Sequence, residues 1–246
     1  MKVLKISGHE IDQPGFLESL AQAVAQAAEP VIVVHGGGKE ITQMQEKYGV
    51  QAQYIDGLRV TDEHSLQITE MVLCGAINTR IVKAFQLAGI EAQGLSGLDR
   101  GLIKAQKLEH PKGDLGRVGE VLAVRGGILL DLVQQGVTPV IAPICLGEDG
   151  AFNVNADHVA GAVGVSVNAE QVVFLTNVKG VLNNQELVPT LTPSIADDLI
   201  EQKVIFGGML PKVRTALHMV EKGARKVVIT NLDGLLANTG TAVVGA

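Results

Sequence analysis

Apolar and polar positions follow two rhythms along the chain, one typical of buried strands and the other typical of amphipathic helices. Continuous aliphatic runs, which are typical of strands buried on both faces of a parallel sheet, occur at 3–7, 31–34, 137–142, 171–177 and 226–230. Apolar residues spaced three or four apart, which indicate helices with one buried face, occur at 15–28, 39–48, 63–87, 128–135, 157–167, 193–202 and 209–222. The alternation predicts an α/β fold, an open three-layer αβα sandwich around a mostly parallel sheet.

Two local features complete this prediction. Residues 92–124 contain short β-like runs separated by glycines, which predict a hairpin region, and we expect the last strand at 226–230. Asp62 directly precedes the predicted helix 63–87, where its carboxylate can act as an N-cap. Because no repeat or linker interrupts the pattern, we expect a single domain over residues 1–246.

Composition narrows the classes of function. The 246 residues are 46% apolar, enough for a full core, so a disordered chain is excluded. A net charge of −6 and an aromatic content of 3% argue against a nucleic-acid partner but leave room for a small anionic ligand. No apolar run reaches the ~18–20 residues of a membrane span, and Cys74 and Cys145 form no C-x-x-C motif, so we expect free thiols in a cytoplasmic protein.

Glycine-rich turns stand where open α/β sheets bind their ligands, beyond the carboxyl ends of strands. Ser7-Gly8 ends the first strand, Gly36-Gly37-Gly38 joins the strand 31–34 to a helix, and Gly207-Gly208 precedes the helix 209–222. Without Cβ atoms, such turns let backbone amides converge on an anion at a helix N-terminus.

Three known glycine motifs do not fit the turn after strand 31–34. A Walker A loop requires Ser or Thr after its Lys, but Glu40 follows Lys39, and a Rossmann fingerprint requires Gly where Ile41 stands. A hydrolase oxyanion loop requires a G-x-S-x-G nucleophile, which the chain lacks.

Two lysines accompany these turns. Lys5 lies within the apolar first strand, where it is costly unless it meets an anion or extends from an edge into solvent. Lys212 follows Pro211 in the first turn of the predicted helix 209–222. Together with the glycine turns, the lysines form a set suited to a polyphosphate.

Polar residues suggest how a substrate could be held. Alternation along an extended segment places Asn153 and Asn155 on one side, where they could bind polar groups, and Asp157 then lies near a helix start. Asp157 is either only an N-cap or also holds the lysines by charge. Arg59, in a loop before a helix, is either a surface residue or a bidentate ligand for a carboxylate.

These residues belong to an ordered set of seven segments: Lys5-Ile6-Ser7-Gly8, His35-Gly36-Gly37-Gly38, Gly57-Leu58-Arg59-Val60-Thr61, Gly94-Leu95-Ser96-Gly97, Asn153-Val154-Asn155-Ala156-Asp157, Leu175-Thr176-Asn177-Val178-Lys179-Gly180-Val181 and Gly208-Met209-Leu210-Pro211-Lys212-Val213. The set spans about 3–229 and resembles the amino-acid kinase family, most closely its members that act on N-acetylglutamate.

The resemblance implies the amino-acid kinase fold and an ATP-dependent phosphorylation of the side-chain carboxylate of N-acetyl-L-glutamate, which gives an acyl phosphate in arginine biosynthesis. A lobe of about 1–170 would bind the amino acid and form a homodimer through the helix 63–87, and a lobe of about 171–246 would bind the nucleotide. Mg²⁺ would arrive with ATP, and no general base would be needed because a carboxylate is already a nucleophile. The chain starts at its first strand, from which we expect no inhibition by arginine.

The resemblance also implies residue roles. Lys5 and Lys212 would stabilise the migrating phosphoryl group, with Asp157 orienting both. Amides of Ser7-Gly8 and Gly36-Gly37 would bind phosphate oxygens and the reacting carboxylate. The α-carboxylate would bind Arg59, and the remaining polar groups would bind Asn153 and Asn155. The residues implied to face ATP are Lys5, Ser7, Gly8, Thr176, Asn177, Gly180, Gly208, Met209 and Lys212.

The chain departs from the family pattern at several positions. Ser7 stands where relatives usually have Gly, and Asn177 replaces a common Asp. Leu98 and the segment Cys74-Gly75-x-x-Asn78 resemble the related kinase of lysine biosynthesis, which phosphorylates an N-blocked 2-aminoadipate, often attached to an acidic carrier protein. A non-catalytic, metabolite-sensing member of the family is a further alternative.

Overall fold

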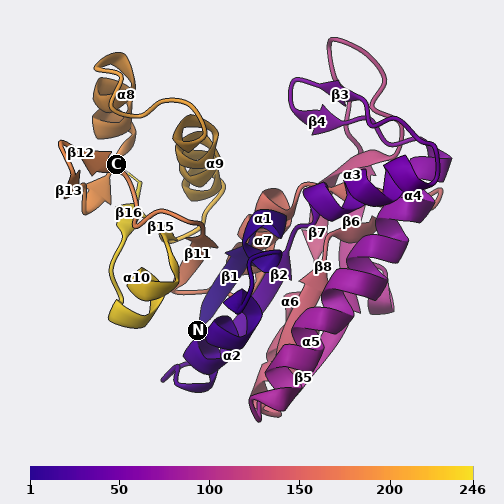
Figure 1. Cartoon of the computed structure of the whole chain (residues 1–246), viewed down its shortest axis with the longest axis horizontal. Helices are drawn as coiled ribbons and strands as arrows, with labels where there is room; N and C mark the ends of the chain where they lie inside the picture. Colours follow the sequence, from indigo (N-terminus) through magenta and orange to yellow (C-terminus); the bar gives the residue numbers. More distant parts are fainter. Residues whose placement is uncertain (246) are drawn as a thin grey trace.

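The computed structural model describes residues 1–245 and contains an eight-stranded central sheet in the order β14-β16-β15-β11-β1-β2-β8-β5 (Figure 1). Its strands are β1 (Lys2–Ile6), β2 (Val31–His35), β5 (Ala92–Ser96), β8 (Thr138–Ala142), β11 (Gln171–Leu175), β14 (Thr190–Leu191), β15 (Val227–Thr230) and β16 (Thr241–Val243). Six neighbouring strands are parallel, and β16 and β14 run in the opposite direction. The predicted mostly parallel sheet is confirmed.

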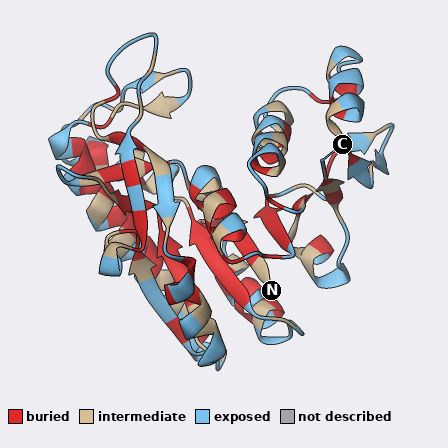
Figure 2. Ribbon diagram, turned by 180° about the vertical axis from the view of Figure 1, so that it is seen from behind, coloured by how far each residue is buried: buried red, intermediate tan, exposed pale blue. Residues whose placement is uncertain are grey.

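Helices cover both faces of this sheet. The first layer comprises α1 (Gly8–Ile11), α2 (Phe16–Ala25), α3 (Gly38–Lys47), α4 (Glu63–Glu70), η1 (Met71–Ile77), α5 (Asn78–Leu87) and α10 (Leu232–Ala237). The second comprises α6 (Gly126–Gln134), α7 (Ala156–Ser166), α8 (Pro193–Glu201) and α9 (Met209–Glu221). Successive side chains of a strand point to opposite faces, so Val3 packs under the second layer and Leu4 under the first. Figure 2 shows the central strands buried between the layers, which confirms the three-layer sandwich.

Shorter strands form three additions to the sandwich. The strands β6 (Ile103–Lys107), β7 (Val118–Val124), β9 (Ile144–Leu146) and β10 (Ala151–Val154) close into a small barrel. Two hairpins pair β3 (Tyr54–Ile55) with β4 (Leu58–Arg59) and β12 (Leu182–Asn183) with β13 (Glu186–Leu187). A short 3₁₀ turn, η2 (Asp99–Gly101), precedes β6.

The hairpin expected within 92–124 is only partly present. Strands β6 and β7 pair antiparallel as expected, but β5 pairs parallel with β8 at the edge of the main sheet. Gln93 and Gly94 are exposed in this half-buried edge strand, so the strand lacks the continuous apolar run typical of a parallel sheet. The chain also adds α10 and β16 after the expected last strand.

The helix expected over 63–87 is continuous but has a π-helical segment, η1, at its centre. Asp62 is its N-cap as predicted, because its carboxylate accepts a hydrogen bond from Ser65 N at 2.7 Å. Such π segments occur frequently at functional sites, and this one packs against the glycine turn described below.

Two further observations concern the chain as a whole. Within residues 1–245, none of the helices combines the length and apolar character needed to cross a membrane. Cys74 and Cys145 are both free, as predicted, with Cys145 fully buried and Cys74 partly buried.

Candidate active site

The turns that follow β1 and β2 touch each other backbone to backbone. Gly36 N donates a hydrogen bond to the carbonyl of Ile6 at 2.9 Å, which ties the two strand ends together. A Cβ added to Gly8 would lie 2.8 Å from Gly37 Cα, a distance that real Cβ atoms do not adopt. Gly8 is therefore glycine because the neighbouring turn leaves no space for a side chain.

The amide donors of the second turn differ from those expected. Gly36 was expected to offer its N–H to a ligand, but that N–H is occupied by Ile6. Gly37 is the N-cap of α3 and Gly38 its first residue, and amides in these positions have no acceptor within their own helix. The N–H groups of this turn that remain available to an anion are thus those of Gly37 and Gly38, and Gly36 lines a cavity beside the turn.

Lys5 forms the ion pair that the sequence pointed to. Its Nζ lies 2.7 Å from Asp157 Oδ1, so the two groups form an ion pair. The contact does not have the geometry of a hydrogen bond, because that oxygen accepts none. The ammonium also lies 5.9 Å from the centre of the Phe174 ring. The Lys5 side chain is 16% exposed. Its charge is therefore only weakly screened by solvent and can act on an anion at the end of the strand.

Asp157 is not the N-cap of its helix. The helix α7 begins at Ala156, and Asn155 caps it by accepting a hydrogen bond from Asp157 N at 2.7 Å. Asp157 therefore stands inside the first turn with its carboxylate committed to Lys5. The cap also uses the side-chain oxygen of Asn155, which leaves its amide NH₂ for a ligand.

Lys212 extends from the first turn of α9, which packs on α7. Its Nζ donates to Gly208 O at 3.4 Å and lies within ion-pair distance of none of the carboxylates in residues 1–245. Asp157 pairs with Lys5 without Lys212, so its joint orientation of both lysines remains a prediction.

A cavity of about 320 Å³ collects the residues expected to bind substrate. It is lined by Gly36, Gly37, Arg59, Asn153 and Asn155, together with the apolar side chains of Ile41, Leu58, Leu73, Leu108, Val118, Pro143 and Val154. Asn153 is oriented by a hydrogen bond from its Nδ2 to Thr61 Oγ1 at 3.3 Å. The expected residues come from three separate sequence segments and share one cavity beside the glycine turn.

Arg59 is fixed in this wall by three acceptors from α3. Its Nη2 donates to Gly38 O at 2.9 Å and to Thr42 Oγ1 at 2.7 Å, and its Nη1 donates to Gln45 Oε1. Burial lowers the pKa of its guanidinium, a desolvation that a bound carboxylate would offset. Sequence reasoning missed Thr42 and Gln45, because polar residues on a helix usually face solvent.

These contacts limit how Arg59 can bind a carboxylate. Of its five N–H donors, the free ones are on Nε and Nη1, which do not form an adjacent pair. The expected bidentate contact therefore requires the carboxylate to replace Thr42 or the Gly38 carbonyl as a partner of Nη2.

A hairpin closes over this side of the cavity. Tyr54 of β3 stacks 4.9 Å below the Arg59 guanidinium. At the hairpin tip, Asp56 pairs with Lys112 Nζ at 2.7 Å, and its carboxylate lies 3.4 Å from His110 Nε2. The tip is thereby attached to the loop between β6 and β7, a contact between distant segments that no sequence pattern indicated.

The residues expected to face ATP lie in or just after β1, after β11 and around the start of α9. Thr176 N donates to Thr230 O at 2.9 Å, and Thr176 Oγ1 contacts Asn177 Oδ1 at 3.3 Å. Ser7 is the N-cap position of α1 but makes no side-chain cap hydrogen bond, and Gly208 precedes Met209 at the α9 N-terminus. Their contact with a nucleotide remains a prediction.

Gly180 has a packing reason that the sequence did not reveal. A Cβ at this position would lie 2.6 Å from Thr241 Oγ1 and 2.7 Å from Leu187 Cδ1. The glycine is thus required by the fold of this region, whether or not it also contacts a nucleotide.

His35, the last residue of β2, is fully buried beside the glycine turn. Burial lowers its pKa to about 4, with the Arg80 charge acting in the same direction. Its Nδ1 lies 3.2 Å from Gly36 O, and its Nε2 lies 3.1 Å from Asn78 Nδ2. The ring is therefore neutral at physiological pH and bonded on both nitrogens.

The buried His35 predicts an acid-sensitive fold. In the unfolded chain its pKa returns to about 6.5, so between pH 6.5 and 4 the unfolded state binds a proton that the folded state does not. The free energy of unfolding is therefore highest above pH 6.5, and the His35 contribution lowers it by up to about 3 kcal/mol as the pH falls to 4. Urea unfolding across this range should show a steeper loss for the native chain than for His35→Asn. Equal slopes would contradict the prediction.

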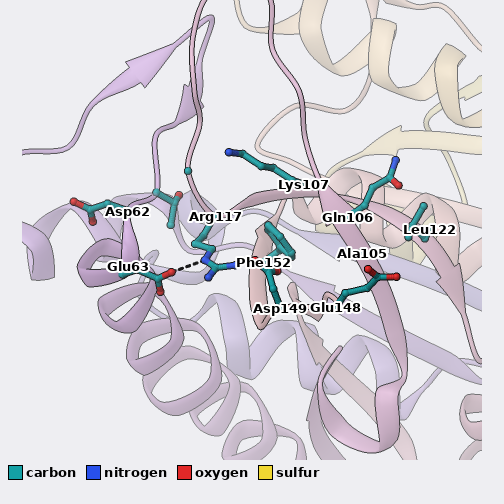
Figure 3. Close-up of a pocket in the computed structure, with 12 residues that line it drawn as sticks. Asp62, Glu63, Ala105, Gln106, Lys107, Arg117, Leu122, Glu148, Asp149 and Phe152 are labelled. Carbon is teal, nitrogen blue, oxygen red and sulfur yellow. Dashed lines mark hydrogen bonds and ion pairs between the residues drawn. The ribbon is translucent and has the colours of Figure 1, made fainter.

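A second cavity, of about 610 Å³, lies against the small barrel (Figure 3). Its centre is Arg117, which pairs with Glu63 at 2.6 Å and with Asp149 at 2.7 Å and lies 5.6 Å from the Phe152 ring centre. None of the expected site residues lines it, so the smaller cavity at the glycine turn is the candidate site. Residues 1–245 contain no cluster of three His, Cys, Asp or Glu side chains placed to hold a metal ion.

The chain is similar to known proteins in both sequence and fold. A sequence model of the amino acid kinase family matches residues 1–231. The acetylglutamate kinase of Roseiflexus castenholzii is 49% identical over 242 residues, which cover 98% of this chain and 93% of the relative. The acetylglutamate kinase of Chloroflexus aurantiacus is 50% identical over 237 residues, 96% and 93% of the two chains. The crystal structure of smu.665 from Streptococcus mutans UA159, 29% identical, superimposes with a TM-score of 0.83 over 99% of this chain and 98% of that one.

Proposed function

The chain belongs to the amino acid kinase family, and on this premise we propose that it uses ATP to phosphorylate the side-chain carboxylate of N-acetyl-L-glutamate, a step of arginine biosynthesis. The observation that carries the proposal is the cavity in which Arg59 and the asparagines face the glycine turn. An acidic amino acid whose amine is blocked has a carboxylate for Arg59, a second carboxylate for the turn and an amide for Asn153. The relatives named acetylglutamate kinases support this substrate over an N-blocked aminoadipate or a purely sensing role.

The reaction needs positioning and charge neutralisation more than proton transfer. The side-chain carboxylate attacks the γ-phosphorus of ATP, the bond from that phosphorus to the β,γ-bridging oxygen breaks, and ADP leaves with the electron pair. Lys5, aligned by Asp157, neutralises charge on the moving group. Amides of Gly8 and Gly37 hold oxygens of the two reactants within reach, and Lys212 on α9 approaches from the nucleotide side.

The proposed ATP-binding region follows from the family membership and from the places of the expected residues in the fold. ATP would lie between the end of β11 and the start of α9, near Thr176, Asn177 and Gly208. Asn177 supplies an amide where a carboxylate would attract a cation, so Mg²⁺ would enter on the ATP phosphates. The metal would supply charge neutralisation of the β- and γ-phosphates.

The proposal extends to the assembly of the protein, its cellular location and the division of the chain between the two substrates. We propose a homodimer through the helix 63–87, on which the large apolar side chain of Met71 is 51% exposed. Free Cys74 and Cys145 suit the reducing cytoplasm. The residues before 170 would bind the amino acid and those after it the nucleotide.

The proposed activity has a direct assay. With ATP, Mg²⁺ and N-acetyl-L-glutamate, the protein should form an acyl phosphate that hydroxylamine traps as a hydroxamate, together with one ADP per hydroxamate. N-acetyl-L-2-aminoadipate is the matched control, and a difference of one methylene predicts about 10–200-fold lower kcat/KM for it. Faster turnover of the aminoadipate, or ligand binding without any ADP, would overturn the proposal.

A further inference from the structure

Three observations around His35 converge on the glycine turn. The imidazole is fully buried at the end of β2. One nitrogen faces the carbonyl of Gly36, and the other faces the side-chain amide of Asn78 from the first turn of α5. Neither side chain lines the cavity proposed for the substrate.

The contacts of Asn78 determine which nitrogen of His35 carries the proton. Asn78 Nδ2 donates to the carbonyl of Val140 at 2.9 Å, so its NH₂ group and not its oxygen faces His35. The second N–H of the same group points to His35 Nε2 at 3.1 Å, which must therefore accept. The proton is consequently on Nδ1, from which it is donated to Gly36 O at 3.2 Å.

The hydrogen bond to Gly36 O has a geometric consequence for the next amide. In a trans peptide the C=O and the following N–H point in opposite directions. Holding the Gly36 carbonyl toward the imidazole therefore turns the Gly37 N–H away from it. The Gly37 N–H is one of the two amides of this turn that have no acceptor within their own helix, and Gly36 and Gly37 line the cavity proposed for the substrate.

Neighbouring residues keep this arrangement rigid. Gly94 of β5 has no Cβ, and a Cβ there would collide with Asn78 Oδ1. Behind the turn, the Leu73 and Ile77 side chains of η1 fill the space that a Cβ of Gly37 would occupy. Two parts of the helix 63–87 therefore contact this region: η1 packs against Gly37, and Asn78 at the start of α5 orients His35.

We propose that His35 and Asn78 are positioning residues that aim the Gly37 amide at the oxygens where charge develops during phosphoryl transfer. This inference rests on the proposed function. An amide donor fixed before the reaction stabilises the transition state without the cost of reorientation. His35 and Asn78 are absent from the wall of the substrate cavity, and Arg59 is held by different partners, so we expect the part of substrate binding that Arg59 supplies to be independent of them.

The test separates kcat from KM. His35→Leu and Asn78→Leu should each lower kcat by about 10²–10³-fold, the usual effect of losing one such donor, while KM for N-acetyl-L-glutamate changes by less than about threefold. His35→Asn, whose NH₂ can occupy the place of Nδ1–H, should restore kcat to within about tenfold of the native value. Thr69→Val is the matched control, because this fully buried hydroxyl bonds only within its own helix, and it should retain native kcat.

A second measurement does not depend on activity. Nitrogen-15 NMR of the histidine rings of the native chain at pH 7.5, with His35 assigned by its absence in His35→Asn, should show a protonated Nδ1 and a bare Nε2. A protonated Nε2 would overturn the proposal, as would a KM that rises as much as kcat falls, or an equal loss in Thr69→Val. Absence of acyl phosphate formation by the native chain would instead overturn the proposed function, and the positioning role with it, whatever the tautomer.

Discussion

Lys5→Met is expected to lower kcat for acyl phosphate formation by about 10³-fold, the scale on which a single cationic or amide group stabilises a developing charge in a transition state. Methionine keeps the length and packing of the side chain but removes the ammonium that Asp157 holds at the strand end. The KM for N-acetyl-L-glutamate should change little, because Lys5 is absent from the wall of the substrate cavity. Steady-state kinetics with both substrates varied would measure the two effects separately.

Lys2→Met is the matched control for this prediction. Lys2 belongs to the same strand, and its Nζ pairs with Glu29 at 3.3 Å at the opposite end, so its loss should leave kcat within about twofold, as for most surface substitutions. Lys212→Ala should behave like Lys5→Met, with turnover reduced much more than binding of acetylglutamate. Equal losses of turnover and binding in either lysine variant would contradict a role in the transition state.

The second large effect is expected on substrate binding. Arg59→Ala should raise KM for N-acetyl-L-glutamate about 10²-fold, equivalent to about 3 kcal/mol, because the α-carboxylate loses its charged partner in a half-buried wall. The kcat at saturation should fall by less than about threefold, since the proposed partner of Arg59 is the α-carboxylate and not the carboxylate that reacts. Isothermal titration of the unreactive enzyme–substrate pair without ATP would confirm that affinity itself has changed.

Two variants make this test specific. Arg59→Lys should recover little affinity, because a single ammonium cannot serve the carboxylate together with Thr42 and Gln45. Arg117→Ala removes a guanidinium that is likewise stacked on an aromatic ring and paired, but in the cavity of Figure 3. If Arg117→Ala raised KM as strongly as Arg59→Ala, the assignment of the carboxylate site would be wrong.

The sandwich itself was predictable because buried parallel strands and one-sided helices leave strong periodic signals. The five aliphatic runs all became strands of the central sheet. The edge strand β5 and the terminal β16 were missed or misplaced, since half-buried or very short strands need few apolar residues. The β6–β7 pair of the small barrel was expected, but the closure of the barrel was not, because closure depends on contacts between β6, β7, β9 and β10 and not on local pattern.

The site was predictable to the level of residue types and turn positions. Lys5 in an apolar strand pointed correctly to an anionic partner, and Arg59, Asn153 and Asn155 share a cavity with the glycine turn. Which amides are free was not predictable, because Gly36 loses its N–H to Ile6 across two strands. Nor could spacing show that His35 and Asn78, far apart in the chain, hydrogen-bond inside the core.

The π-helical segment η1 determines where the rest of its helix points. An α-helix turns by about 100° per residue, so a wider π turn shifts the angular phase of everything that follows it relative to what precedes it. Leu73 and Ile77 lie within this segment, and Asn78 follows immediately. Shortening the segment by one residue would restore a regular α-helix yet rotate Asn78 by roughly a quarter turn, away from His35. The π-helical segment therefore determines the rotation of α5 relative to α4. This rotation lets Asn78 face His35 while Leu73 and Ile77 pack against Gly37.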